Sequence, residues 1–313
     1  MLAYVSHMKI PCLAKLFCFT LVFFLLLRGG VGAQEVVKST ENLDADRPEA
    51  WAMSYFSSLS LLAGLGTPHT RDPGSIEIGF EADWIPKLGK SLKKVGFNGL
   101  KEDDLNKVPI LMRPRFTLGL PWKFALTLSY LPPIEVFGVE LNLFAFALER
   151  PLYERAPWTI GVRAYGQVGT ISGAFTCPSD VAKFPSGTPQ NLFGCEKKSN
   201  DIATQRYGGL EFSGSYRIER LRGLTPYIAV AGNFLDHKFR VRARTFGFAD
   251  RRRLLADAWT FSASAGVTYP LTERLSLSVG LFYSPLWVTR PPDTTSQNDP
   301  LFNVRSMITY RFF

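Results

Sequence analysis

Charged residues recur at intervals of two, four or six positions in three separate segments of this 313-residue chain, with apolar residues between them. The positions are Glu77, Glu81 and Asp83 in the first segment, Arg113 and Arg115 in the second, and Arg305 and Arg311 in the third. In a β-strand, residues two apart point to the same face. If the three segments are neighbouring strands, carboxylates and guanidiniums therefore form a ladder of ion pairs. Two interpretations follow: the ladder fills an interior and fixes the strands, or it is a charged constriction that selects solutes.

A second charged set is purely basic. Its members alternate along one segment and continue in the loop after it: Lys238, Arg240, Arg242, Arg244, Arg251, Arg252 and Arg253. With the lysines of residues 87–94, they predict a strongly positive face. We consider two roles for it, contact with anionic lipid headgroups and attraction of anionic solutes.

Redox and catalytic chemistry have few candidates. Cys177 and Cys195 lie in a segment rich in Pro, Ser, Gly and Asn, which predicts one disulfide in a surface loop, with two free thiols as the alternative. We expect no metal or cofactor, because only His69 and His237 could join these sulfurs downstream of the leader. Asp236 and His237 are adjacent, so a regular strand sends them to opposite faces.

No catalytic motif accompanies these residues. The sequence contains no G-x-S-x-G, H-E-x-x-H or glycine-rich phosphate loop. We therefore expect no enzyme and name no catalytic residue. The remaining catalytic alternative is a lipid-modifying site in which His237 meets a serine across the fold.

The elements that position these residues are alternating strands. About ten are expected, over residues 75–84, 108–120, 123–131, 135–148, 158–170, 204–218, 226–241, 257–269, 274–288 and 302–313. Most are close to the length that a tilted membrane strand needs. A soluble sandwich also alternates, but the tryptophans at strand ends, namely Trp84, Trp122, Trp158, Trp259 and Trp287, are typical of membrane-interface girdles.

The N-terminal region predicts export. Residues 1–33 have a charged start, a short apolar run and a small-residue cleavage site, and are interpreted as a cleaved signal peptide. Residues 34–66 are interpreted as a periplasmic segment, with a helix over 47–63 that begins at the capping-box pattern Asp46-x-x-Glu49 and lies in the barrel mouth or on the periplasmic rim. The alternative is a strand, which would make twelve.

The C-terminal residues carry a class signature. Ile308, Tyr310 and Phe312 share one face of a strand that runs to the end of the chain. This tail resembles the C-terminal assembly signal of Gram-negative outer-membrane β-barrel proteins. The resemblance implies an antiparallel up-and-down transmembrane barrel over residues 67–313, located in the outer membrane and inserted by the barrel assembly machinery. Short turns on the periplasmic side and long loops outside agree with it.

These patterns lead to a functional hypothesis. The favoured function is a small passive or weakly selective pore, and the alternative is a plugged barrel with a structural or surface-interaction role. The expected partners are outer-membrane lipids and lipopolysaccharide. Nucleic acid is excluded because an exported chain does not meet it.

Overall fold

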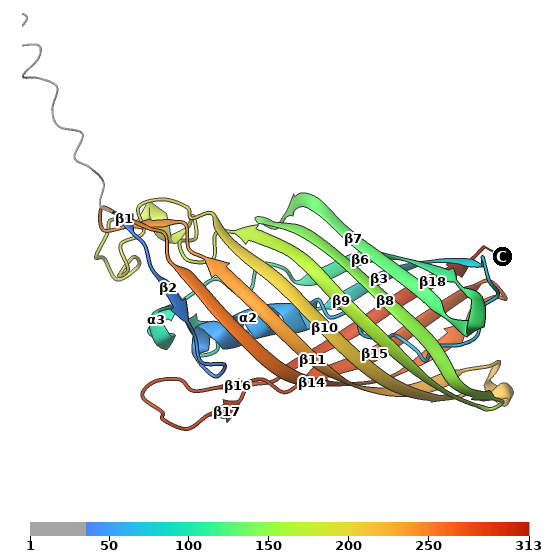
Figure 1. Cartoon of the computed structure of the whole chain (residues 1–313). Coiled ribbons are helices and arrows are strands. Elements are labelled where there is room, and N and C mark those ends of the chain that lie inside the picture. Colours follow the sequence, from blue (N-terminus) through green and yellow to red (C-terminus); the bar gives the residue numbers. More distant parts are fainter. Residues whose placement is uncertain (1–35, 313) are drawn as a thin grey trace, which may run out of the picture.

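Ten long antiparallel strands close into a barrel, as Figure 1 shows. The structure is a computed structural model and describes residues 36–312; the predicted signal peptide lies outside them. The barrel strands are β3 (Ile76–Trp84), β6 (Ile110–Gly119), β7 (Ala125–Val136), β8 (Val139–Arg155), β9 (Trp158–Gly173), β10 (Asp201–Tyr216), β11 (Thr225–Arg240), β14 (Arg253–Pro270), β15 (Leu275–Ser284) and β18 (Leu301–Arg311). The predicted architecture and strand count are confirmed.

Each barrel strand pairs with the next barrel strand along the chain, and one further pairing closes the barrel. β3 pairs with β18, with Asp83 opposite Arg305, so the first and last barrel strands meet. β11 pairs with β14 across the loop between them. Closure leaves no free edge in the barrel wall, which removes the open edge that a terminal strand otherwise presents.

Alternation separates the two faces of the wall. The outward face of β3 carries exposed Ile78, Phe80 and Trp84, while Glu77 and Glu81 on the inward face are buried. The other strands repeat this division. The barrel wall therefore has an apolar outer surface, as a membrane-spanning barrel requires, and its inner face carries the charged side chains.

The connections differ at the two ends. At one end the turns are short and include η1 (Pro121–Lys123) and η3 (Glu219–Leu221), and β18 finishes there. At the other end all but one of the connections are long. They contain β4 (Lys94–Val95), α3 (Gly96–Gly99), β5 (Lys101–Glu102), η2 (Val181–Lys183), β12 (Ala243–Thr245), β13 (Phe248–Asp250), β16 (Trp287–Val288) and β17 (Gln297–Asn298). We call these the short-turn end and the long-loop end.

The N-terminal segment passes through the barrel. β1 (Val36–Val37) pairs with β13, and β2 (Thr40–Asn42) pairs with the start of β14, both at the long-loop end. The helix α2 (Pro48–Leu59) then lies within the barrel (Figure 1). Farther on, the Thr70 hydroxyl bonds to Glu154 and the amide of Gly74 bonds to the carbonyl of Gly119, both near the short-turn end. The chain thus enters at the long-loop end and leaves at the short-turn end, where β3 begins.

This placement decides between the two positions expected for the helix of residues 34–66, the barrel mouth and the periplasmic rim. The helix and the ten-strand count are confirmed, and α2 lies inside the barrel at its long-loop mouth. Its N-cap is Arg47, with Pro48 in the first turn, and no side chain caps it. Asp46 instead accepts a 2.6 Å hydrogen bond from the hydroxyl of Thr289, in the loop after β15. Among residues 36–312, no helix is long and apolar enough to cross a membrane.

The helix buries its apolar side chains against the barrel wall. Trp51, Tyr55 and Leu59 are almost fully buried, and so are Leu61 and Leu62 in the segment that follows. They pack against wall residues such as Tyr207 and Phe282. An apolar core therefore fills the lumen toward the long-loop end, and the charged residues lie next to it, toward the short-turn end.

Candidate functional site

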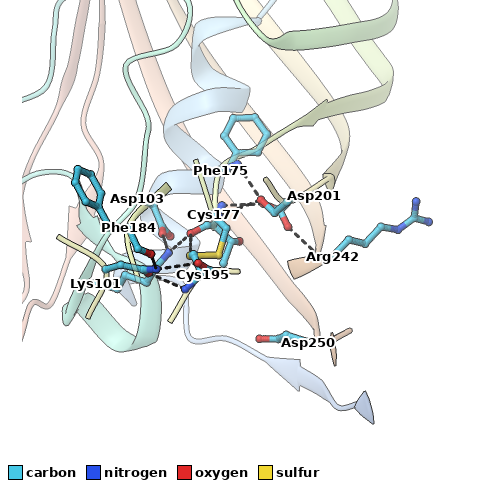
Figure 2. The surroundings of a disulfide bond; sticks show 12 residues. Lys101, Asp103, Phe175, Cys177, Phe184, Cys195, Asp201, Arg242 and Asp250 are labelled. Carbon is cyan, nitrogen blue, oxygen red and sulfur yellow. Dashed lines mark hydrogen bonds and ion pairs between the residues drawn. A yellow bond between two sulfur atoms is a disulfide. The ribbon is translucent and has the colours of Figure 1, made fainter. Parts of the chain in front are cut away.

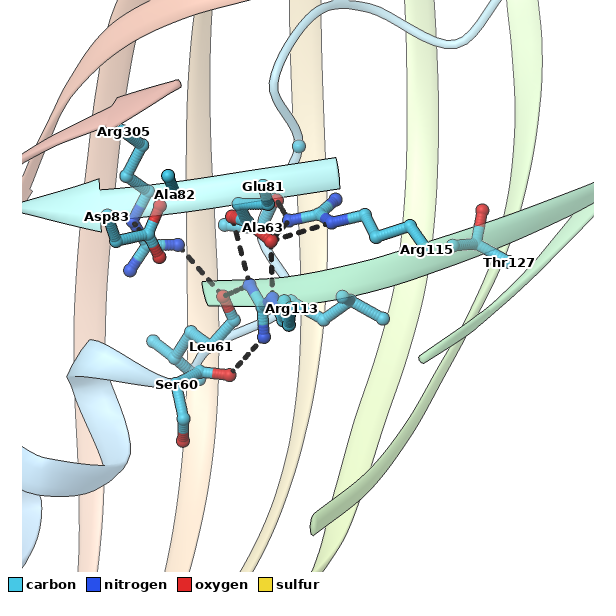
Figure 3. A network of polar contacts seen from close by, with 12 residues as sticks. Ser60, Leu61, Ala63, Glu81, Ala82, Asp83, Arg113, Arg115, Thr127 and Arg305 are labelled. Atoms are coloured by element: carbon cyan, nitrogen blue, oxygen red, sulfur yellow. Dashed lines mark hydrogen bonds and ion pairs between the residues drawn. The ribbon is translucent and has the colours of Figure 1, made fainter. Parts of the chain in front are cut away.

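The site with the densest polar chemistry is the ladder on the inner faces of β3, β6 and β18. Glu81 stands directly opposite Arg113 in the β3–β6 register, and Arg305 stands opposite Asp83. All four side chains are at most 2 % exposed. The structure therefore brings the three predicted segments together around one point of the lumen (Figure 3).

Glu81 is the centre of this cluster. Its carboxylate contacts the guanidinium of Arg113 and lies 2.6 Å from a nitrogen of Arg115. One buried carboxylate thus holds two arginines. Buried charges are tolerated when they are paired and their remaining donors are satisfied. The role of the ladder therefore depends on which acceptors the other N–H groups of these arginines bind.

Those donors bind the backbone of the N-terminal segment. Arg113 donates to the carbonyls of Ser60 and Leu61, at 2.8 and 2.9 Å. Arg115 donates to the carbonyl of Ala63 at 3.1 Å. Figure 3 shows the side chains of Arg113 and Arg115 reaching from the wall to this segment.

Arg305, on the closing strand β18, is the third arginine that binds this segment, and we call Arg113, Arg115 and Arg305 together the arginine clamp. It donates to the carbonyl of Leu61 at 2.8 Å and to that of Ser58 at 3.1 Å. Its guanidinium carbon lies 3.8 Å from the centre of the Phe282 ring. Asp83 is more distant, with 3.8 Å between its carboxylate and Nε of Arg305.

The clamp solves a problem common to helix ends. The last carbonyls of a helix lack intrahelical partners and carry a partial negative charge. At the end of α2 the carbonyls of Ser58 and Leu59 lie inside the barrel and accept hydrogen bonds from Arg305. Arg113 and Arg115 bind carbonyls of the segment that follows the helix. The central members of the ladder therefore hold the inserted segment to the barrel wall.

A second charged cluster, which the sequence analysis did not include, continues the clamp toward the short-turn end. Arg163 bridges Glu149 at 2.6 Å and also contacts Glu211. Glu211 in turn accepts a 2.9 Å hydrogen bond from the amide of Gly64. Arg71, in the inserted segment, lies 2.6 Å from Glu149. The wall members Glu149, Arg163 and Glu211 could have been predicted from the sequence, since all of them occupy inward-facing positions of alternating strands.

The remaining ladder members lie at the open edge of this second cluster. Glu77 accepts from Arg71 at 2.8 Å and from Arg311 at 2.9 Å. The side chain of Arg311 is about half exposed, unlike that of the buried Arg305. Arg311 therefore belongs to the short-turn mouth and takes no part in the central clamp.

Polar side chains also hold the helix itself. His237, almost fully buried on β11, has its two ring nitrogens 3.4 Å from the hydroxyl of Ser54 and 3.1 Å from that of Ser57. Tyr207 donates to the carbonyl of Ser60 at 2.6 Å and accepts from the amide of Leu62 at 2.9 Å. The serine contact that the sequence analysis left open for His237 thus comes from α2, inside the barrel.

Two cavities lie on either side of the clamp. One, of about 130 Å³, is at the long-loop end and is lined by Met53, Phe56 and His237 among others. The other, of about 490 Å³, opens at the short-turn end and is lined by Thr67, Glu149 and Arg311 among others. Residues 57–64 line neither cavity, and they include the fully buried Leu61 and Leu62. The inserted segment thus divides the lumen.

The predicted disulfide forms in the loop after β9. The Cα atoms of Cys177 and Cys195 are 5.6 Å apart. Figure 2 shows Asp201 beside this bond. Its carboxylate accepts from the amides of Phe175, Thr176 and Arg242, at 3.1, 2.7 and 2.9 Å. One carboxylate therefore ties the disulfide loop to the end of β11.

The basic set divides in the structure. Arg240, Arg242, Arg244, Arg251 and Arg253 line two surface grooves at the long-loop end. Arg252 instead pairs with Asp250, 2.7 Å away, and lies 4.9 Å from the centre of the Phe97 ring. Lys238 lines the 130 Å³ cavity.

The predicted girdle tryptophans are all exposed. Trp122 and Trp158 are at the short-turn end, and Trp84, Trp259 and Trp287 are toward the long-loop end. The sixth tryptophan, Trp51, is buried in the lumen. Over the described range 36–312, no three His, Cys, Asp or Glu side chains gather as a metal-ion site.

Comparisons with known proteins find similarity among solved structures. No family model and no curated protein matches the chain. Similar solved structures include the outer membrane protease OmpT from Escherichia coli, with TM-score 0.37 and 10% identity over 76% of this chain and 94% of that chain. The translocator domain of the autotransporter NalP from Neisseria meningitidis has TM-score 0.43 and 10% identity over 86% and 99%.

The attachment invasion locus protein Ail of Yersinia pestis has TM-score 0.30 and 12% identity over 77% of this chain and 99% of that chain. At these identities the similarity concerns the fold alone. The similar structures named here are outer-membrane β-barrel proteins of Gram-negative bacteria.

Proposed function

We propose that this chain is an outer-membrane barrel that its own N-terminal segment keeps closed, and that it acts through its long-loop face as a surface-interaction protein. The supporting observation is the arginine clamp. Arg113, Arg115 and Arg305 reach from the wall to the backbone of residues 58–63 and hold that segment across the lumen. An open pore would require these buried donors and carbonyls to lose their partners together, which is costly in a water-poor interior.

The membrane context of the proposal has separate support. The exposed apolar residues of the outer face and the tryptophans at both ends fit a lipid bilayer. We propose that the outer face contacts outer-membrane lipids, including lipopolysaccharide, after export through a cleaved leader. We also propose that the barrel assembly machinery receives the β18 end, where Tyr310 and Phe312 are exposed with ring centres 4.9 Å apart.

Conductance tests the closed state. Purified wild-type protein in a planar lipid bilayer should show no steady current above background. An Arg113→Ala/Arg305→Ala variant should show opening events, because it has lost five of the hydrogen bonds that hold residues 58–61. The matched control is Arg217→Ala, which breaks an ion pair with Glu219 at the short-turn end. Both side chains of this pair are exposed, so the control should show no current. A steady open current from the wild type would contradict the proposal.

We further propose that His237 anchors the helix and takes no part in catalysis. Both of its ring nitrogens face serine hydroxyls of α2. The described residues place no carboxylate in hydrogen-bond contact with this ring, so a third group that would orient it for nucleophilic catalysis is missing. Turnover of a phospholipid or of lipid A that disappears in a His237→Ala variant would refute this assignment.

A further inference from the structure

Two grooves at the long-loop end are lined by cations and contain no acidic residue. Their volumes are about 620 and 580 Å³, and they share Arg242 and Arg251. The cations of the first groove are Lys197, Lys198, Arg242, Arg244 and Arg251, and those of the second are Lys38, Arg240, Arg242, Arg251 and Arg253. We call the two together the basic grooves.

Three segments far apart in the sequence build the grooves, and backbone hydrogen bonds fix them. The amides of Arg251 and Arg253 bond to the carbonyls of Val37 and Ser39, both at 2.9 Å. In the disulfide loop, the amide of Asn200 bonds to the carbonyl of Arg242 at 3.1 Å. The cations are thus carried on a paired backbone, which reduces the ordering that a ligand must bring about.

Most of these cations have no acidic partner. Within residues 36–312, Arg244 pairs with Glu196 at 2.6 Å and Lys198 lies 3.9 Å from Glu135, while the other six cations have no ion pair. Nearby carboxylates are engaged elsewhere. Asp250 binds Arg252, and Asp201 binds the backbone amide of Arg242. Figure 2 shows the Arg242 side chain extending away from this cluster.

The basic grooves concentrate positive charge, and their cations repel one another. Like charges held together raise the local potential and draw anions to the surface. Guanidiniums also match phosphate oxygens in paired hydrogen bonds, more specifically than lysines do. The chemistry therefore fits a ligand that carries more than one phosphate.

The position of the grooves indicates where such a ligand comes from. Arg240 and Arg253 are cross-strand partners on β11 and β14. Six residues away on the same outward face, Phe234 and Trp259 are also partners, with ring centres 5.1 Å apart, and Trp259 is 80% exposed. Exposed tryptophans of this kind mark the membrane interface. Six strand residues span about 20 Å, so the basic grooves lie beyond the hydrocarbon layer.

We propose that the basic grooves bind phosphate groups on the saccharide of an outer-leaflet glycolipid of the lipopolysaccharide type. The inference rests on the proposed function, in which the long-loop end faces outward. Lipid-facing aromatic residues and phosphate-binding cations then lie on one continuous face, at the heights of the acyl chains and of the saccharide. Arg242 and Arg251 contribute to both grooves and are the most important contacts.

Binding of purified lipopolysaccharide to the detergent-solubilised full chain tests the proposal. An Arg242→Gln/Arg251→Gln variant should bind at least about tenfold more weakly than wild type, as expected for the loss of charge-assisted hydrogen bonds. The matched control is Lys87→Gln/Lys90→Gln, which removes two exposed lysines from another loop at the same end. Its affinity should stay within about twofold of wild type, because lysines that bind no phosphate add only weak surface electrostatics.

Two further probes separate the possible ligands. For dephosphorylated lipopolysaccharide, the affinities of the wild type and of the Arg242→Gln/Arg251→Gln variant should no longer differ. Inositol hexakisphosphate, a soluble polyphosphate, should compete only weakly, because it lacks the acyl chains that contact the adjoining aromatic face. Equal losses in the test and control variants, unchanged binding after dephosphorylation, or tighter binding of the soluble polyphosphate would overturn the proposal.

The outcome is independent of the conductance test. Both variants should keep wild-type heat-modifiable migration in electrophoresis, which reports an intact barrel. If the wild type conducts but its affinity for lipopolysaccharide still depends on Arg242 and Arg251, the closed barrel is refuted and the basic grooves are not. A silent wild type without this dependence would refute the basic grooves alone.

Discussion

The guanidinium of Arg305 donates a 2.8 Å hydrogen bond to the carbonyl oxygen of Leu61. Arg305 belongs to the last strand of the barrel, and Leu61 belongs to the segment that follows the lumen helix. A single contact therefore connects the closing seam with the inserted chain. The stability of the wall and the closure of the lumen should depend on the same arginines.

Replacing Arg113 should be strongly destabilising. An Arg113→Met variant keeps much of the side-chain volume but leaves Glu81 with one partner fewer. It also removes one of the two donors to each of the buried carbonyls of Ser60 and Leu61, which keep only Tyr207 and Arg305. Removing one partner of a buried ion pair typically costs about 3–5 kcal/mol. Urea unfolding in lipid vesicles, followed by tryptophan fluorescence, measures the loss.

The control for this change is Arg217→Met, which removes an arginine whose ion pair with Glu219 is exposed on both sides. Such pairs contribute about 0–1 kcal/mol. Equal destabilisation by the two variants would contradict a special role for the clamp.

The anchor at His237 should be weaker than the arginine clamp. A His237→Ala variant leaves the buried hydroxyls of Ser54 and Ser57 without their partner on β11, which costs about 1–3 kcal/mol. His237→Gln, which keeps a donor and an acceptor, should recover part of the loss. The same unfolding assay compares the two variants, and no difference between them would count against the hydrogen-bonding role.

The disulfide should protect its loop more than it stabilises the barrel. A Cys177→Ser/Cys195→Ser variant loses a cross-link over a separation of 18 residues, a loop size for which chain entropy predicts about 3 kcal/mol. The barrel strands pair independently of this loop, so their circular dichroism should stay unchanged. Trypsin should cut faster at the exposed Lys197. Cleavage at the wild-type rate would show that Asp201 holds the loop without the disulfide.

The pH dependence of the first long loop should come from Asp103. Burial raises the pKa of this carboxyl to about 6, and the neighbouring Lys101, 2.5 Å away, opposes the rise. Because the pKa in the folded protein lies above the ordinary value, folding favours the protonated form. Asp103 therefore favours the folded loop below its ordinary pKa, and this contribution is lost as the pH rises through about 6.

Hydrogen exchange of the amides in residues 94–105, corrected for intrinsic rates, measures this effect. Protection should be higher at pH 5 than at pH 7.5, and an Asp103→Asn variant should lose most of the difference. Protection that rises with pH in the wild type would mean that the ion pair with Lys101 outweighs burial.

The barrel could be predicted from the sequence because its pattern is local. Residues two apart share a face, so the alternation that contains Glu81 and Phe80 fixes the strand and both of its surfaces. The even strand count and the lengths of the connections then follow. Closure places β18 beside β3, and so Arg305 opposite Asp83.

The inserted segment could not be predicted in this way. Nothing near Leu61 in the sequence indicates that its carbonyl meets Arg305, 244 residues away. The capping-box pattern at Asp46 predicted a helix, yet the chain uses Asp46 to bind Thr289. The second cluster around Arg163 could have been found from inward parity. Its contact with residues 64–71 depends on where that segment lies, which only the three-dimensional structure gives.

The central claim is that the chain runs through the lumen from the long-loop end to the short-turn end, and thiol labelling on intact cells tests it most directly. Within residues 36–312 the only cysteines, Cys177 and Cys195, are joined in a disulfide. A cysteine introduced at the exposed Lys38, beside β2, therefore supplies a specific target, and one at Glu273, exposed in a short turn, supplies the matched control. A membrane-impermeant maleimide should label the Lys38→Cys variant on intact cells and the Glu273→Cys variant only after the outer membrane is permeabilised. Labelling of Lys38→Cys only after permeabilisation, with a normally folded barrel, would contradict the account.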